Sequence, residues 1–258
     1  MIDPEIQKIV QSRILDIQKE HDVEILLAVE SGSRAWGFPS MDSDYDVRFI
    51  YRHRLEWYLK VLPERDVIEY PIVGIMDYSG WDLKKSLFLL NKSNPVLFEW
   101  FQSPLVYFEK AGFREAFAPA LSAYLSPPAM IYHYLHMADR NYREYLKRDY
   151  VKVKKYFYVL RPIFACQWVH RFSSAPPMDF EELKNAVLEN QELNGVISDL
   201  LIRKRSGGEL GEEPKIELIN DFVEHALFSL HTTAKDFDPE KKSDSQLLNA
   251  LFISIVLK

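Results

Sequence analysis

The residues best suited to chemistry lie between positions 31 and 49, in the sequence SGSRAWGFPSMDSDYDVRF. Gly32 and Ser33 form a small polar pair just after an apolar run, and an Asp-x-Asp follows after ten residues as Asp44 and Asp46. Alternate residues of a β-strand point to the same face, so carboxylates at this spacing converge if the segment is a strand. The pattern therefore predicts a cation site next to a turn that can approach phosphate.

Two neighbouring carboxylates are costly in a folded protein unless a cation neutralises them. Carboxylate oxygens are hard ligands that favour Mg²⁺, with Mn²⁺ as the alternative, and Mg²⁺ also binds triphosphate oxygens. Gly32 lets nearby backbone amides approach the β- and γ-phosphates closely, and Ser33 adds a hydroxyl. Together these residue types suit a metal-dependent nucleotidyl transfer. An isolated Asp-x-Asp, in contrast, is common in solvated turns, which is the competing interpretation.

Hydrophobic spacing indicates the elements that must position these residues. Residues 3–20 carry Ile and Val at helical spacing, and residues 23–30 form a short apolar run typical of a buried strand. The next expected elements are a strand at 47–51, a helix at 55–62, one or two strands within 67–79, and helices at 82–91 and 94–100. From about Pro127 the spacing is helical throughout, with expected helices at 129–150, 151–172, 180–193, 197–205 and 216–230.

We therefore predict an α+β fold with two domains. Residues 1–110 are expected to form an N-terminal domain with a mixed β-sheet and flanking helices, and residues 111–258 an all-helical C-terminal domain. The seam lies near residues 104–127, where prolines punctuate the chain.

Composition limits the class of protein. The chain has 258 residues, of which 47% are hydrophobic and 27% charged, as is ordinary for a soluble globular protein. Its apolar runs are too short or too interrupted to span a bilayer, and its acidic, amphipathic start is unlike a signal peptide. The single Cys166 excludes an internal disulfide and a Cys-rich zinc site, so a reducing, cytoplasmic location is expected. Its apolar neighbours predict that it is buried.

Charge is unevenly distributed. The formal net charge of −6 argues against a continuous basic surface for long duplexes. Residues 140–161 nevertheless hold eight Lys or Arg residues against two acidic residues. A local basic face on an acidic protein suits a polyanionic ligand held at one site, and a solvated helix face is the alternative interpretation.

The Gly-Ser pair, the gap and the Asp-x-Asp together resemble the signature of the DNA polymerase β-like nucleotidyltransferase superfamily. The chain also resembles a bacterial and phage branch of predicted nucleotidyltransferases that includes RNA-ligase-associated, RNA-repair polymerases. The segments that carry this resemblance span most of residues 30–170: GSRAWGFPSMDSDYDVRFIY, GWDLKKSLFLLNKSNPVLFEW and VKKYFYVLRPIFACQW.

The resemblance implies a Mg²⁺-dependent enzyme that moves a nucleoside monophosphate from an NTP to an acceptor hydroxyl and releases pyrophosphate. An RNA 3′ end is one acceptor, and a protein side chain or a small molecule, as in toxin and antibiotic-modifying relatives, is the alternative. A non-catalytic nucleotide-binding module is a second class of function. A protein partner is compatible with the sequence but not indicated by it, and no membrane association is expected.

The superfamily also implies a third carboxylate on a nearby strand. Glu69, Asp77 and Asp82 each lie between apolar or aromatic neighbours. Asp77 has the cleanest strand context and is preferred, because Glu69 precedes a proline and Asp82 opens a predicted helix that it would cap. By resemblance, Asp44, Asp46 and Asp77 would bind the metals, and Asp77 would orient or deprotonate the attacking hydroxyl.

Five further residues are candidates for contacts to the nucleotide. Arg34 and Arg48 flank the acidic pair, although Arg48 could instead form an ion pair with one of the acids. Lys85 lies in the first turn of the helix after the third-carboxylate strand, where most lysines are simply solvated. Lys155 and Tyr158 share a helix face in the second domain. By resemblance to two-domain relatives, they would contact triphosphate and base when that domain closes; an ordinary helix surface is the alternative.

Overall fold

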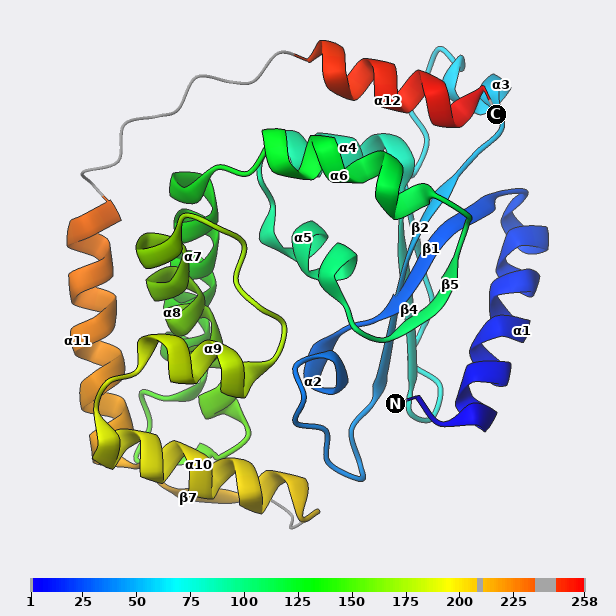
Figure 1. Ribbon diagram of the computed structural model, residues 1–258. Coiled ribbons are helices and arrows are strands. Elements are labelled where there is room, and N and C mark those ends of the chain that lie inside the picture. Colours follow the sequence, from blue (N-terminus) through cyan, green and yellow to red (C-terminus); the bar gives the residue numbers. More distant parts are fainter. Residues whose placement is uncertain (1, 208–210, 235–244, 258) are drawn as a thin grey trace. The chain divides into compact units, whose positions relative to one another are not determined.

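The computed structural model describes residues 2–207, 211–234 and 245–257 (Figure 1). The chain forms two compact units, which are described separately. The N-terminal unit contains the chain up to Ala35, Asp44–Tyr124 and helix α12 (Gln246–Val256). The helical unit contains Trp36–Ser43 and the chain from Leu125 through helix α11 (Glu217–Ala234).

A five-stranded mixed sheet forms the centre of the N-terminal unit, with strand order β3-β4-β2-β1-β5. Strands β2 and β4 run parallel, and the other neighbouring strands are antiparallel. The mixed sheet predicted for this part of the chain is therefore confirmed. The strand bounds are β1 (Glu24–Glu30), β2 (Tyr45–Arg52), β3 (Val67–Glu69), β4 (Met76–Asp82) and β5 (Val106–Glu109).

Helices cover both faces of this sheet (Figure 1). On one face lies α1 (Pro4–His21), which Asp3 caps at its N-terminus; on the other lie α4 (Leu83–Asn91) and α5 (Pro95–Gln102). The remaining helices of this unit are α2 (Gly32–Ala35), α3 (Leu55–Tyr58), α6 (Phe113–Ala123) and α12. The C-terminal α12 packs here through Phe252, whose ring lies 4.9 Å from that of Tyr58.

The core beneath α1 fixes which side chains of β2 are available for chemistry. Val47, Phe49 and Tyr51 are fully or almost fully buried in one core with residues of α1. Because alternate strand residues point to opposite faces, Asp46 and Arg48 lie on the other face of the sheet. The hydrophobic effect thus sets the direction of the acidic side chain.

The helical unit consists mainly of α7 (Pro127–Tyr145), α8 (Lys155–Phe172), α9 (Phe180–Val187), α10 (Gln191–Arg205) and α11. The long α7 and α8 pack against each other, and Cys166 on α8 is fully buried, as predicted. None of the helices in the described segments is both long and apolar enough to cross a bilayer.

The structure departs from the predicted elements in several places. The predicted helices 55–62, 180–193 and 197–205 are observed as α3 (Leu55–Tyr58), α9 (Phe180–Val187) and α10 (Gln191–Arg205). The predicted helices 129–150 and 151–172 were wrong where they meet, because β6 (Tyr150–Lys152) pairs there with the distant β7 (Glu212–Pro214). The predicted seam holds β5 and α6, and α12 was not anticipated. The units also differ from a single division at residue 110, since Trp36–Ser43 belongs to the helical unit and α12 to the N-terminal unit.

Candidate active site

Asp46 and Asp77 lie side by side on parallel strands. The β2–β4 register pairs Asp46 directly with Asp77. Arg48 connects them: its Nη2 atom lies 2.8 Å from Asp46 Oδ1 and 2.7 Å from Asp77 Oδ2. The ion-pair interpretation of Arg48 is therefore the one that the structure shows. All three side chains are between 19% and 27% exposed, so both carboxylates are half-buried but open to solvent.

The Gly-Ser turn packs directly on Asp46. The amide of Ser31 donates to the Asp46 carbonyl oxygen at 2.9 Å, which joins the end of β1 to the start of β2. Gly32 has φ +59°, a conformation that L side chains rarely adopt. A Cβ atom on Gly32 would lie 2.1 Å from Asp46 Oδ2. Only glycine therefore allows this turn and this carboxylate to occupy their positions together.

Arg34 ties the turn to the other half of the motif. Its Nε atom donates to the Asp44 carbonyl oxygen at 3.1 Å, and its guanidinium lies 3.6 Å from the centre of the Tyr45 ring. Asp44 precedes β2, and its side chain is exposed. Ser33 lies in α2 beside Arg34 and is half-buried. Local contacts thus bring Gly32 close to Asp46 and Arg34 close to Asp44.

Sequence reasoning missed Glu30, the last residue of β1. This side chain is 1% exposed; its Oε1 accepts from the Asp46 amide at 2.9 Å, and its Oε2 accepts from the Tyr107 hydroxyl. Burial raises the pKa of Glu30 from 4.5 to about 7, although both hydrogen bonds favour the charged form. A glutamate that closes an otherwise apolar strand just before the Gly-Ser pair was the available signal.

The raised pKa of Glu30 predicts a pH-dependent stability difference. Between pH 4.5 and about 7 the native state holds a proton that the unfolded chain has lost, so this group lowers stability as pH rises. Glu30→Gln removes the titration and keeps an acceptor for the Asp46 amide. The free energy of unfolding of the variant minus that of the wild type should therefore rise by about 3 kcal/mol from pH 4.5 to about pH 7. Urea unfolding of both proteins at several pH values measures the difference; a constant difference would contradict the assignment.

The acidic pair has the chemistry of a divalent-cation site. Burial raises the pKa of Asp46; Arg48 opposes this effect, while Asp77 and Asp44 reinforce it. Hard carboxylate oxygens from these three aspartates suit Mg²⁺. Within residues 2–207, 211–234 and 245–257, no three acidic, His or Cys side chains form a ready metal cluster. Since the Arg48 guanidinium lies between two of the carboxylates, a cation bound by both would have to displace at least one of its ion pairs.

The alternative third carboxylates lie elsewhere. Glu69, on β3, pairs with Ser79 of β4 in register and forms an exposed ion pair with Arg65 at 2.6 Å. Asp82 is fully buried at the start of α4, where it accepts from the Tyr58 hydroxyl and the Lys84 amide, each at 2.7 Å. Both carboxylates thus have structural partners, which leaves Asp77 as the acid beside Asp46.

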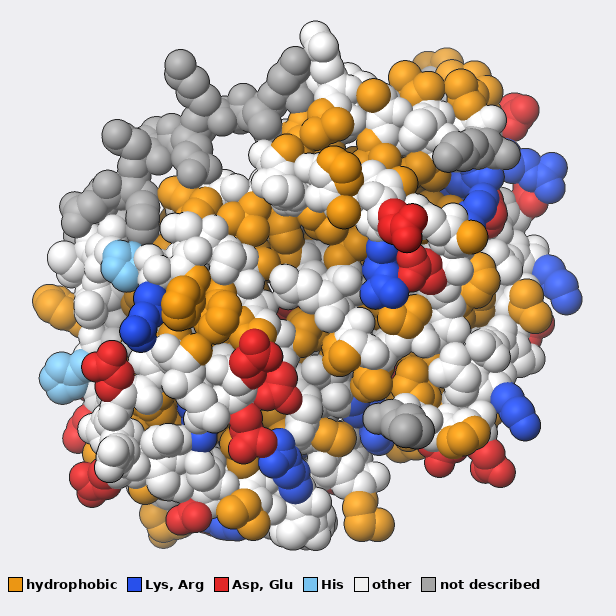
Figure 2. Space-filling view, in the orientation of Figure 1, with side chains coloured by type: hydrophobic (Ala, Val, Ile, Leu, Met, Phe, Trp, Pro, Cys, Tyr) orange, Lys and Arg blue, Asp and Glu red, His pale blue; other side chains and the backbone are white. Residues whose placement is uncertain are grey.

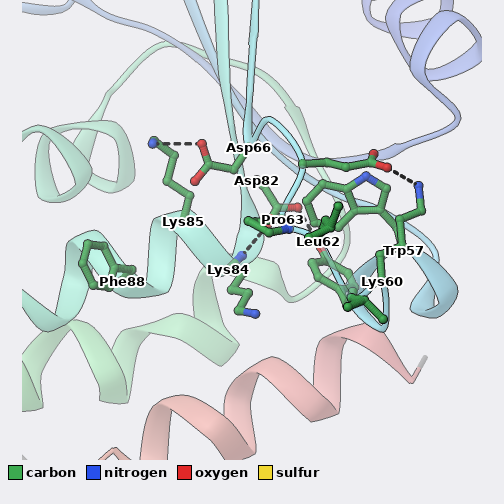
Figure 3. Close-up of a pocket in the computed structure, with 12 residues that line it drawn as sticks. Trp57, Lys60, Leu62, Pro63, Asp66, Asp82, Lys84, Lys85 and Phe88 are labelled. Atoms are coloured by element: carbon green, nitrogen blue, oxygen red, sulfur yellow. Dashed lines mark hydrogen bonds and ion pairs between the residues drawn. The ribbon is translucent and has the colours of Figure 1, made fainter.

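Lys85 is not brought to the Asp46–Asp77 pair. Its Nζ atom lies 3.1 Å from Asp66 Oδ1, beside a cavity of about 470 Å³ that Asp82 and Phe88 also line (Figure 3). Asp77 and Asp82 are five residues apart on β4, a separation of roughly 17 Å along the strand. The helix that carries Lys85 begins at the opposite end of the strand from the candidate site, so we leave Lys85 out of that site.

Lys155 and Tyr158 lie together on α8 in the helical unit. The Lys155 Nζ atom is 3.9 Å from the centre of the Tyr145 ring and 5.0 Å from that of Tyr158. The Tyr158 ring in turn meets the ring of Trp36 edge-on, with 6.0 Å between their centres. Tyr158 is therefore a neighbour of Trp36, and Lys155 is a neighbour of Tyr158.

That segment, Trp36–Ser43, is anchored in the core of the helical unit. Phe38 is 1% exposed, and its ring centre lies 5.1 Å from that of Phe157 and 5.3 Å from that of Phe180. The Phe180 amide also donates to the Trp36 carbonyl oxygen at 3.0 Å. The chain thus leaves the N-terminal unit after the Gly-Ser turn, packs in the helical unit, and returns at Asp44.

Comparisons with known proteins show which family this chain is similar to. A family model described as "RNA repair pathway DNA polymerase beta family" (RlaP) matches residues 6–254. A Bacillus subtilis (strain 168) protein, "Uncharacterized protein YcgL", is 47% identical over 250 residues, which cover 95% of this chain and 96% of that protein. The crystal structure of a nucleotidyltransferase-like protein from Exiguobacterium sibiricum 255-15 aligns over 98% of this chain and 87% of that chain. Its TM-score of 0.36 and 10% identity are too low to carry an argument.

Proposed function

This chain belongs to the RlaP family, the RNA repair pathway DNA polymerase beta family, and we propose that it is a nucleotidyltransferase. In the proposed reaction, an acceptor hydroxyl oxygen attacks the α-phosphorus of an NTP and loses its proton. The bond between the α-phosphorus and the bridging oxygen breaks, and pyrophosphate leaves. The products are the acceptor carrying a nucleoside monophosphate and free pyrophosphate.

One observation carries this proposal: Asp46 and Asp77 are adjacent in the β2–β4 register, and Gly32 packs closely against the Asp46 carboxylate. Asp44, Asp46 and Asp77 would hold Mg²⁺, or Mn²⁺, which when bound would neutralise phosphate charge and favour ionisation of the acceptor hydroxyl. Asp77 would accept the proton of the attacking hydroxyl or orient that group. Before the substrate binds, the positive charge of Arg48 would offset the repulsion between the two carboxylates.

The remaining predicted residues would bind the nucleotide. Backbone amides around Gly32 and the Ser33 hydroxyl suit the β- and γ-phosphates, and Arg34 lies in the same turn. Arg48 becomes available to a phosphate oxygen if it leaves one carboxylate. Lys155 and Tyr158 on α8 are proposed to contact phosphate and base, supported by the contact of Lys155 with the Tyr158 ring and of that ring with Trp36.

The acceptor that we propose is an RNA 3′ end, on the strength of the family description. The test is to incubate the pure protein with each α-labelled NTP in turn, with Mg²⁺ or Mn²⁺ and total RNA, and to identify the labelled molecule. We expect label in RNA. Label on a protein or a small molecule would redirect the acceptor assignment, and binding without transfer of any label would indicate a nucleotide-binding module.

A further inference from the structure

The helical unit contains a cavity of about 350 Å³ where α7 ends, β6 forms and α8 begins. This volume falls within the usual range for sites that bind small ligands or single groups of larger ones. Its lining includes Tyr145, Arg148, Tyr150, Lys152 and Lys155, which we call the basic aromatic pocket. Arg148, Tyr150 and Lys152 are not part of the candidate active site described above.

The lining of the pocket carries three cations and two acids, and Lys152 stands opposite Glu212 in the β6–β7 register. Within the described part of the chain, neither Arg148 nor Lys152 forms an ion pair, and two acids, Glu144 and Glu212, also line the cavity. Burial lowers the pKa of Lys155; the charges of Lys154 and Lys152 act in the same direction, and that of Glu144 opposes them. An anion placed among these three cations would relieve their mutual repulsion.

Aromatic faces lie next to this charge. Tyr150 is 61% exposed and Tyr158 is 39% exposed, so both rings are accessible to a planar group. Lys155 is held between the rings of Tyr145 and Tyr158, which fixes its amine near them. Cations interleaved with exposed aromatic rings are typical of surfaces that bind single-stranded nucleic acid, because phosphates meet the cations and unpaired bases stack on the rings.

The mixed charge of the chain favours a short, local contact over a long duplex. On the face shown in Figure 2, Lys and Arg side chains intermingle with Asp and Glu side chains. The net charge of −6 has the same implication. Within the helical unit, Lys155 of the pocket lies 5.0 Å from the centre of the Tyr158 ring, which in turn meets the Trp36 ring edge-on.

We propose that the basic aromatic pocket binds the single-stranded end of the RNA acceptor, with Arg148 and Lys152 on phosphates and Tyr150 stacked on a base. This inference rests on the proposed function only in taking RNA as the acceptor. A free nucleotide shares the same chemistry, and the experiment below separates the two sources.

The test is fluorescence anisotropy of the full chain with a roughly 12-nucleotide, fluorescein-labelled unstructured RNA, in EDTA and without NTP. The double variant Arg148→Gln/Lys152→Gln should bind at least about tenfold more weakly, with a salt dependence reduced by about one to one and a half units of slope. Tyr150→Leu should weaken binding about tenfold. Lys8→Gln/Lys19→Gln, which removes the same charge from the exposed surface of α1, is the matched control and should bind nearly as the wild type does.

Binding of a fluorescent NTP by the same proteins forms the second arm. The proposal is overturned if the wild type does not bind the RNA, if the pocket and control variants lose RNA affinity equally, or if the pocket variants lose NTP affinity while retaining RNA affinity. Both arms measure binding and not catalysis. RNA binding at the pocket would therefore support the proposal even if the protein transferred no nucleotide. Equal thermal unfolding midpoints of the variants show that any loss is local.

Discussion

Asp77→Asn should lower nucleotidyl transfer by about 1,000-fold or more, while Glu69→Gln leaves it within about twofold. Asp77 is the carboxylate beside Asp46, and Arg48 bridges the two, whereas Glu69 is an exposed partner of Arg65. Asparagine keeps the size of the side chain and removes the charge that would hold a cation or take a proton. Steady-state transfer of label from an NTP measures both variants.

The stabilities of the two variants must be compared, so that a loss of activity is not caused by unfolding. Both positions are solvent-accessible, so neither substitution should change the urea midpoint greatly. Full activity of Asp77→Asn, or loss of activity in Glu69→Gln, would assign the third carboxylate to a different residue. The fully buried Asp82 is a poor control, because its removal would also uncap α4.

Gly32→Ala should reduce transfer by about 100-fold or more, because its Cβ atom would collide with Asp46 Oδ2 at 2.1 Å. Gly74→Ala is the matched control. Gly74 has φ +61°, nearly the same as the +59° of Gly32, but a Cβ atom there would meet nothing within 4 Å. Both variants therefore suffer the same backbone strain, about 1–2 kcal/mol, and only one displaces the carboxylate.

The two glycine variants separate the effect of backbone strain from the effect of displacing the Asp46 carboxylate. We expect both to unfold at lower urea concentration than the wild type, and only Gly32→Ala to lose activity beyond that explained by the folded fraction. Equal activities of the two variants would show that the close approach of Gly32 to Asp46 is not needed for the reaction.

Short-range patterns predicted much of this site. Gly32, Ser33, Asp44 and Asp46 lie within fifteen residues of one another, so strand alternation and glycine chemistry were enough to group them. The strand context of Asp77 favoured it as the third carboxylate, which stays a prediction; the β2–β4 register places it beside Asp46.

The parts that the sequence did not reveal depend on long-range pairing. The partners of Glu30, the Asp46 amide and the Tyr107 hydroxyl, are known only once β1, β2 and β5 are adjacent. The position of Lys85 follows from the direction of β4, which carries α4 away from the acids. Strand β6 depends on pairing with a segment about sixty residues further along the chain, so local spacing favoured helix there.

The central claim is that the carboxylates at the start of β2 perform metal-dependent transfer of a nucleotide. Incorporation of α-labelled NTP by Asp44→Asn/Asp46→Asn, compared with the wild type at equal folded concentration, tests it most directly. The double substitution removes both charges while keeping side-chain size. The account predicts that label transfer falls to background; transfer that survives in the double variant would contradict it.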